Sequence, residues 1–335
     1  MRVWMGLALG IALGLGLSAP AQAMDRIGLS LQGKPQARFA GYYVAKAKGF
    51  YQHEGIDLAL RPLGRAMRPF EPLLDDEVKF HVGWVGELLA QRDQGQPVVG
   101  IMQVVQRSTM LLLGRRSQGL RAPSDLAGQT MGIWLGRDTA PRAFLERQGL
   151  TGQVKLVPQG FAMASFIERD LPVVSALRDD EYYTALQELK RRMQDPSDLI
   201  AFELADFGLD FPEDALITQQ ATVKDERGLC ERMVRATKAG WEYALAHPQE
   251  AVDLMIQANP SLDRAHQEWM LKELGRTIVA GPAATEGIGY VPLRAIQAQI
   301  EVMREFRELS APQKAEEAFA PEVWDRALGK SAALN

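Results

Sequence analysis

Cysteine is nearly absent from this chain, because Cys230 is the single one among 335 residues. One thiol can form neither an internal disulfide nor a cysteine metal site. Histidine is also scarce. The chain has four, His53, His81, His247 and His266, and none has a partner at metal-ligand spacing. We therefore predict no metal site, and we expect Cys230 to lie in the core, since it shares a helical face with apolar residues.

Catalytic and nucleotide-binding signatures are missing as well. The chain has no GxSxG, no HExxH, no GxxxxGK[ST] and no GxGxxG after a strand. The chain therefore has no sequence motif that indicates an enzyme or a bound cofactor, and we expect neither. Lys+Arg 38 against Asp+Glu 42 gives a net charge of −4, so no basic excess exists to neutralise a phosphate backbone. Nucleic acid is thus not an expected partner.

No apolar run is long enough to cross a bilayer, which takes roughly 20 residues. The longest candidate, residues 5–17, follows Arg2 and precedes the small-residue tripeptide Ala21-Gln22-Ala23. A positive start, a short apolar stretch and small residues at the cleavage site are typical of a secretory signal peptide. We predict that residues 1–23 are removed, that no lipid anchor forms because no cysteine is near, and that the mature protein is periplasmic without stable membrane insertion.

Short apolar runs alternate with helical patterns through the first two thirds of the mature chain, which predicts an α/β fold with mainly parallel sheets. After about residue 222 the pattern is almost entirely helical. Gly- and Pro-containing stretches suggest crossings between two lobes at 115–128 and 205–214. Strands are expected at 27–31, 56–60, 80–82, 98–102, 110–113, 130–133, 154–156, 173–177 and 215–218.

One segment is more specific than these patterns. Residues 36–58 read QARFAGYYVAKAKGFYQHEGIDL, from a loop through a helix into a strand. This segment resembles the opening motif of periplasmic binding proteins related to thiamine-precursor and aliphatic-sulfonate uptake. The similarity continues in the same order over nearly the whole mature chain, at residues 92–99, 103–108, 124–134, 211–217 and 236–243.

The resemblance implies a type II periplasmic binding protein fold, with two α/β lobes, two crossing hinge strands and a ligand between the lobes. We expect residues 24–113 and 217–335 to form one lobe and residues 114–216 the other. The implied function is the substrate-binding component of an ABC transporter. Its expected partners are a small molecule and the transporter permease, and we expect the protein itself to be a monomer.

Loops after strand ends form the crevice in open α/β sheets. Residues at such positions, in the order of the family motif, are the predicted ligand contacts. They are Gln36, Arg38, Phe39, Tyr42, Trp84, Glu87, Gln106, Ser108, Trp134 and Arg137.

An acidic stretch follows the strand at 173–177. In related chains an Asn-Glu-Tyr lies here, whereas this chain has Asp180, Glu181 and Tyr182 after Asp179. Carboxylates accept hydrogen bonds from amino groups and repel anions. The cluster therefore predicts an amine-bearing heterocycle, most simply a thiamine-precursor pyrimidine, and Glu181→Ala should weaken its binding about ten- to a hundredfold.

Two other functions remain open at this point. Arg38, Arg107, Arg115 and Arg137 could anchor an anion, which fits a receptor for taurine, another sulfonate or nitrate. A related enzyme branch makes the thiamine pyrimidine and consumes its own histidine. The resemblance places a lysine and a histidine of that branch at residues 83–87, where this chain has Gly83 and Glu87 instead.

Overall fold

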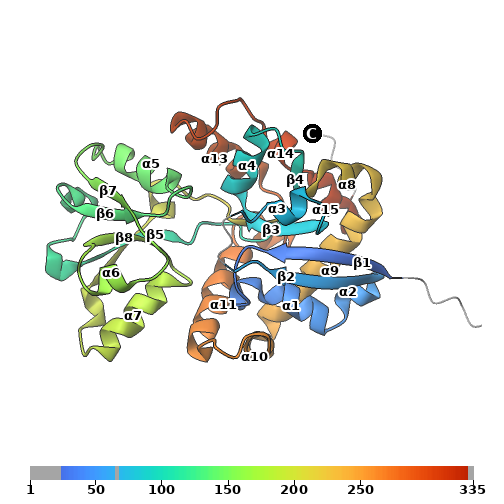
Figure 1. The fold of residues 1–335 in the computed structure, drawn as a ribbon, viewed down its shortest axis with the longest axis horizontal. Helices are drawn as coiled ribbons and strands as arrows, with labels where there is room; N and C mark the ends of the chain where they lie inside the picture. The colour runs from blue at the N-terminus through green and yellow to red at the C-terminus, as the bar shows by residue number, and fades with distance from the viewer. Residues whose placement is uncertain (1–23, 65–67, 331–335) are drawn as a thin grey trace, which may run out of the picture.

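The computed structural model describes residues 24–64 and 68–330. The predicted signal peptide, residues 1–23, lies outside the described residues. Two five-stranded sheets stand side by side, each covered by helices, and two chain segments connect them (Figure 1). The predicted α/β fold of two lobes is therefore confirmed.

The sheet of the first lobe has the order β2-β1-β3-β10-β4. Strands β1 and β2 run parallel, as do β1 and β3, whereas β10 is antiparallel to both of its neighbours. The alternating side chains Ile27, Leu29 and Leu31 of β1 are buried, as the period of two predicts. The strands are β1 (Asp25–Leu31), β2 (Ile56–Pro62), β3 (Phe80–Trp84), β4 (Val98–Gln103) and β10 (Asp214–Gln219).

The sheet of the second lobe has the order β7-β6-β8-β5-β9. Here β5 is antiparallel to both β8 and β9. Each sheet thus contains one antiparallel strand, β10 or β5, beside a crossing segment, so the expectation of mainly parallel sheets holds only for the other pairs. The strands are β5 (Met110–Arg115), β6 (Thr130–Ile133), β7 (Lys155–Pro158), β8 (Val173–Leu177) and β9 (Leu199–Glu203), of which β9 was not predicted.

The crossings follow from this pairing. The chain enters the second lobe between β4 and β5, at residues 104–109, and returns between β9 and β10, at residues 204–213. The return agrees with the predicted 205–214. The entry comes earlier than the predicted 115–128, because the apolar run at 110–113 pairs with β8 instead of closing the first sheet. The expected lobe boundaries, 113/114 and 216/217, fall inside β5 and β10.

Helices cover both faces of each sheet. In the second lobe they are α5 (Thr139–Arg147), α6 (Ala164–Ile167) and α7 (Glu181–Arg191). The first lobe holds α1 (Ala40–Ala47), α2 (Phe50–His53), α3 (Glu71–Leu74), α4 (Val85–Asp93), α8 (Gln220–Asp225), α9 (Arg227–Ala246), α10 (Pro248–Ala258), α11 (Arg264–Ile278), α12 (Ala283–Glu286), α13 (Leu293–Glu305), α14 (Ala315–Ala318) and α15 (Pro321–Ala327).

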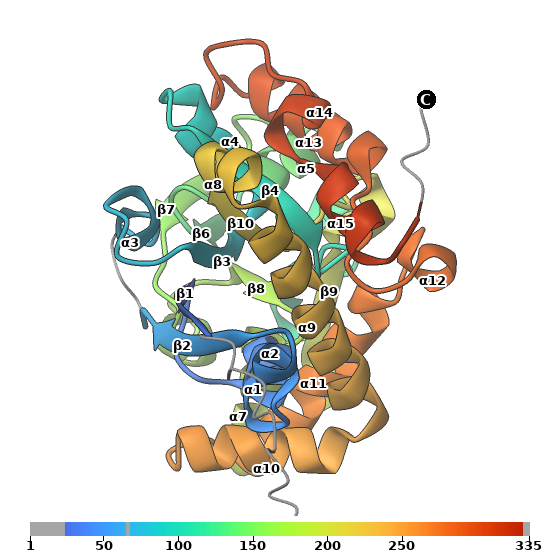
Figure 2. The same ribbon diagram turned by 90° about the vertical axis from the view of Figure 1, so that its right-hand side faces the viewer.

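The long helix α9 packs against α1, α2 and α15 (Figure 2). A Cβ at Gly240 would lie 2.2 Å from the carbonyl oxygen of Gly41, and one at Gly41 would lie 2.3 Å from the Trp241 ring. Glycine at these positions lets the α1 and α9 backbones touch. Cys230 on α9 is fully buried in this core, as predicted.

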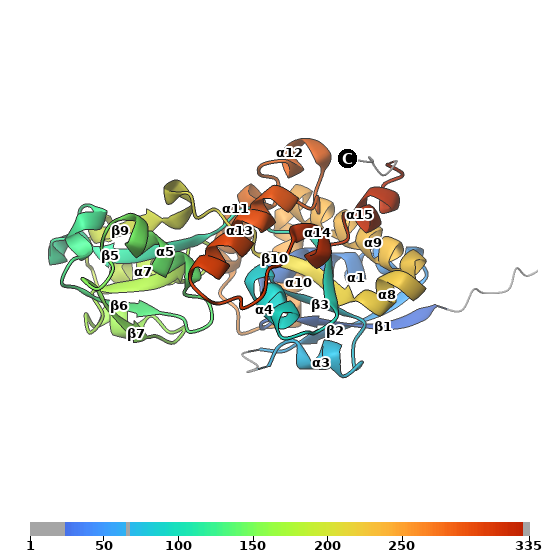
Figure 3. The same cartoon turned by 90° about the horizontal axis from the view of Figure 1, so that it is seen from above.

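Helix α13 belongs to the first lobe but reaches the second, where it meets α5 (Figure 3). Its Val302 is part of the apolar core of the second lobe, and Phe306 and Trp84 pack against that core. Among the described residues, no helix combines the length and apolarity needed to span a membrane.

Candidate functional site

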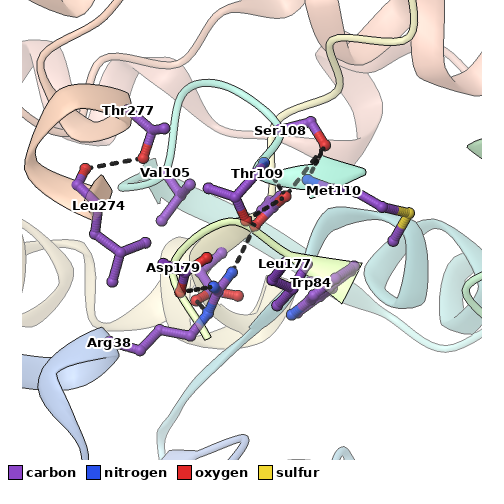
Figure 4. Close-up of polar contacts among 12 residues, drawn as sticks. Arg38, Trp84, Val105, Ser108, Thr109, Met110, Leu177, Asp179, Leu274 and Thr277 are labelled. Carbon is purple, nitrogen blue, oxygen red and sulfur yellow. Dashed lines mark hydrogen bonds and ion pairs between the residues drawn. The ribbon is translucent and has the colours of Figure 1, made fainter. Parts of the chain in front are cut away.

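The two lobes meet where strand-end loops face each other, beside both crossings. Arg38 lies in the short 3-10 helix η1 (Ala37–Phe39), directly after the loop that follows β1. Its side chain is only 6% exposed. Its guanidinium bonds three carboxylates: Nε donates to Asp214 at 2.7 Å, Nη1 to Asp179 at 2.9 Å and Nη2 to Glu213 at 2.6 Å (Figure 4). We call these four residues the Arg38 cluster. Because Asp179 follows β8 of the second lobe, the cluster joins both lobes.

The Arg38 cluster has one cation for three carboxyl groups. Burial raises the pKa of Asp179 and of Glu213, and the nearby Arg38 opposes the rise in both. Glu213 Oε1 also accepts the backbone N–H of Thr109 at 2.6 Å and the hydroxyl of Ser108 at 3.2 Å. Glu213 on the return crossing is thereby hydrogen-bonded to Ser108 and Thr109 on the entry crossing. The predicted ligand contact Ser108 thus donates to a carboxylate of the protein itself.

A second cluster lies beside the first and is more open to solvent. The Arg137 guanidinium carbon stands 3.8 Å from the centroid of the Trp84 ring. Arg137 Nε and Nη2 donate to Glu87 Oε1 at 3.2 and 3.1 Å. We call Trp84, Glu87 and Arg137 the Trp84 cluster. Trp84 and Glu87 come from the end of β3 and the start of α4, whereas Arg137 comes from the loop after β6, so this cluster also joins the lobes.

Gln32, which was not predicted, hydrogen-bonds two residues of the Trp84 cluster. Its side-chain oxygen accepts the backbone N–H of Trp84 at 3.3 Å, and its amide nitrogen donates to Glu87 Oε2. An amide can accept and donate at once, so Gln32 fixes both the start of α4 and the Glu87 carboxylate. Its place directly after β1 was the available sequence signal.

A cavity of about 60 Å³, partly open to solvent, lies at the Trp84 cluster. It is lined from both lobes, with Met110, Ala140 and Phe211 supplying apolar surface. Of the predicted contacts, Trp84, Glu87, Ser108 and Arg137 line this cavity. The structure thus brings together four predicted residues from three separate stretches of sequence.

Other predicted contacts have partners inside the protein. Phe39 and Tyr42 are each 1% exposed and belong to the core of the first lobe, where Tyr42 meets Trp241 edge to face. Gln106 is buried, and its amide donates to the carbonyl oxygens of Gln103 and Tyr290. None of these three side chains is among the residues that line the cavity.

Gln36 and Trp134 lie at loops near the site. Gln36 is half-buried, and its backbone carbonyl accepts the N–H of Phe39 in η1. Trp134 is buried at the end of β6, where it stacks on Phe161 with ring centroids 5.5 Å apart and donates to the carbonyl of Gly160 at 3.3 Å. Trp134 therefore supports the loop that carries Arg137.

The three carboxylates of the acidic turn after β8 each have a different partner. Asp179 bonds Arg38, Asp180 faces His266 Nε2 at 3.1 Å, and the Glu181 carboxylate accepts the N–H of Leu177 at 3.1 Å. Glu181 is 6% exposed, and burial together with the neighbouring Asp180 raises its pKa to about 8. The structure thus gives each carboxylate a partner within the protein.

Tyr182 lies beside a second contact between the lobes. It stacks on Trp269 of α11, with ring centroids 6.2 Å apart, and Trp269 Nε1 donates to the carbonyl oxygen of Arg178 at 2.9 Å. Trp269 and His266 were not predicted, because their helix is far from the family motifs in sequence. Among the described residues, no group of three or more His, Cys, Asp or Glu side chains could hold a metal ion.

Two curated relatives align with most of the chain. A riboflavin-binding protein, RibY, from Chloroflexus aurantiacus is 29% identical over 312 residues, which cover 89% of this chain and 86% of the relative. A formylaminopyrimidine-binding protein from Halalkalibacterium halodurans is 23% identical over 241 residues, covering 70% of this chain and 71% of the relative.

The fold is also that of known periplasmic binding proteins. The aliphatic sulphonate binding protein SsuA from Escherichia coli superposes with a TM-score of 0.70 at 10% identity, covering 88% of this chain and 91% of SsuA. This confirms the type II fold that the sequence resemblance implied. Residues 36–251 match the family model described as NMT1/THI5 like, and the chain belongs to that family.

Proposed function

We propose that this protein is the exported receptor of an ABC import system and binds a planar nitrogen heterocycle with N–H donors between its lobes, without turnover. The observation that carries the proposal is the Trp84 cluster. It combines a flat aromatic face with a carboxylate acceptor, Glu87, at a cavity lined from both lobes. Flat apolar surface with a few placed polar groups is typical of small-molecule sites.

The chemistry of the cluster supports this ligand class. The indole of Trp84 offers a face on which a ring can stack. A carboxylate such as that of Glu87 accepts hydrogen bonds and donates none, so it favours amino or ring N–H groups. Two relatives bear names that specify riboflavin and formylaminopyrimidine, each of which contains a planar nitrogen heterocycle.

A sulfonate or nitrate ligand is the second candidate, because Arg137 lines the same cavity. In this structure, however, the Arg137 guanidinium already bonds Glu87. An anion would have to separate that pair and then lie near Glu87, the buried Glu213 and the other carboxylates of the Arg38 cluster. Like charges brought together in a buried site are costly, so the heterocycle is favoured.

The test is calorimetric titration of residues 24–335 with riboflavin, formylaminopyrimidine, taurine and nitrate. We expect binding of a heterocycle and no measurable binding of the two anions. Trp84→Ala should weaken heterocycle binding by about ten- to a hundredfold, since stacking on an aromatic side chain contributes roughly 1–3 kcal/mol.

Trp84→Phe is the matched control, because it keeps a flat ring at the same position and should retain most of the affinity. Anion binding that persists in Trp84→Ala and is lost in Arg137→Ala would contradict the proposal and identify an anion receptor.

A further inference from the structure

The Arg137 side chain has the chemical features of the ligand just proposed. Its guanidinium is planar and carries several N–H donors. It lies over the Trp84 ring at 3.8 Å and donates two hydrogen bonds to Glu87 Oε1. An amino-substituted heterocycle would use the same ring face and the same carboxylate oxygen.

The site has too little space for the Arg137 guanidinium and a ring-sized ligand to occupy it together. The cavity beside Trp84 measures about 60 Å³. Small-molecule sites commonly measure roughly 300–1,000 Å³. Arg137 is one of the side chains that fill the space between the lobes, so a ring-sized ligand on this face of Trp84 needs the volume that the guanidinium takes.

The surroundings of Arg137 allow it to leave. It follows Gly136, whose φ of +79° is in the left-handed region, and nothing lies within 4 Å of where a Cβ at Gly136 would be. Leu135, two residues before Arg137, is 69% exposed. Arg137 is therefore on an open loop at the surface end of β6, whereas Trp84 and Glu87 are fixed by Gln32.

We propose that Arg137 is a built-in competitor that occupies the ligand position on Trp84 and Glu87 and must be displaced for ligand to bind. This inference rests on the function proposed above. It makes Arg137 a specificity-determining residue: an incoming molecule must supply both a flat face for Trp84 and N–H donors for Glu87 to replace the guanidinium. A flat molecule without donors leaves Glu87 Oε1 without the donors that Arg137 supplied, and an anion meets Glu87 as a like charge.

The experiment measures the dissociation constant of formylaminopyrimidine, or of riboflavin if that is the heterocycle bound, for the wild type and for Arg137→Ala. Removing the competitor should tighten binding about three- to tenfold. Guanidinium chloride at tens of millimolar should then weaken binding to Arg137→Ala more than to the wild type, because free guanidinium takes the position left by the side chain. Sodium chloride at equal concentration controls for screening.

Arg142→Ala is the matched control variant. Arg142 lies on the adjacent helix α5 and pairs with Asp138, without contact to Trp84 or Glu87 in the structure. Its removal should leave the dissociation constant unchanged. Thermal melts of both variants establish that each is folded.

Unchanged or weaker heterocycle binding in Arg137→Ala would overturn the inference and make Arg137 a neutral residue or a direct ligand contact. That outcome leaves the proposed function intact as long as Trp84→Ala still weakens heterocycle binding about ten- to a hundredfold. A Trp84→Ala variant that binds the heterocycle normally would instead overturn the proposed function.

Discussion

Two arginines join the lobes of this protein, and they do so under different conditions. Arg38 is 6% exposed and bonds three carboxylates, from both lobes and from the return crossing. The Arg137 side chain is 16% exposed and bonds one carboxylate, Glu87, which is itself 24% exposed. Breaking a buried ion pair leaves an uncompensated charge, whereas a partly hydrated pair can exchange partners at low cost. The comparison indicates a fixed contact between the lobes at Arg38 and an exchangeable one at Arg137.

The largest expected effect is on stability, from Arg38→Ala. Removing the guanidinium leaves Asp179, Glu213 and Asp214 buried together without a cation. The free energy of unfolding should fall by about 3–5 kcal/mol, measured by urea denaturation at neutral pH. Arg61→Ala, which removes an exposed pair with Glu77, is the control and should change it by less than about 1 kcal/mol.

If Arg38→Ala does not fold, Arg38→Lys keeps the charge and loses the three-way hydrogen bonding, so it should still be clearly destabilised. An Arg38→Lys protein as stable as the wild type would show that the Arg38 cluster is not a fixed contact between the lobes.

The next effect separates the two clusters by ligand binding. Glu87→Gln should weaken heterocycle binding about ten- to a hundredfold, since a hydrogen bond to a charged group contributes roughly 1.5–3 kcal/mol. Glu181→Gln should change it less than about threefold, because Glu181 bonds the Leu177 N–H and does not line the cavity. Titration calorimetry compares the two variants, and the reverse order would return the ligand to the acidic turn predicted from sequence.

A smaller effect concerns pH and the Arg38 cluster. Burial raises the pKa of Asp179, so this group contributes stability below the unfolded-state pKa near 4, and the contribution is lost as pH rises through the folded pKa. Asp179→Asn removes that dependence. The loss of stability as pH rises above about 4 should therefore be smaller in the variant than in the wild type.

Glu181 and Glu213 also have raised pKa values, so part of the pH dependence should persist in Asp179→Asn. Urea denaturation at several pH values gives both slopes. A steeper slope in the variant than in the wild type would mean that Asp179 is held ionised in the fold.

The smallest expected effect is that of Arg137→Ala on stability. A partly exposed pair contributes little, so the free energy of unfolding should change by less than about 1 kcal/mol, even though ligand affinity changes. Thermal unfolding without ligand, compared with Arg38→Lys under the same conditions, tests this. A loss of unfolding free energy as large as that of Arg38→Lys would mean that the Arg137 contact, like the Arg38 contact, mainly stabilises the fold.

Much of the architecture was predictable, because periodic apolar runs mark strands whatever their partners are. Nine of the ten strands were expected near their observed positions. The antiparallel placement of β5 and β10 was not, since direction depends on where the chain re-enters a sheet. Residues 110–113 look the same in sequence whether they close the first sheet or open the second.

The candidate site was predictable by position but not by side-chain direction. Trp84, Glu87 and Arg137 follow strand ends, and they do meet between the lobes. Tyr42 also follows the first loop, but the helical turn of α1 points its ring at Trp241. The partners of Arg38 were hidden by distance along the chain, because Glu213 is 175 residues away and no local pattern connects them.

Strand β10 has a consequence for the order in which the molecule assembles. All strands of the second sheet come from one continuous stretch, residues 110–203, so that sheet can complete without waiting for later sequence. The first sheet cannot, because β10 lies between β3 and β4 and joins them only after the chain has returned. As the chain emerges from its N-terminus, the lobe that begins first is the one that must finish last, and its early strands wait through more than a hundred residues of sequence for the partner that connects them.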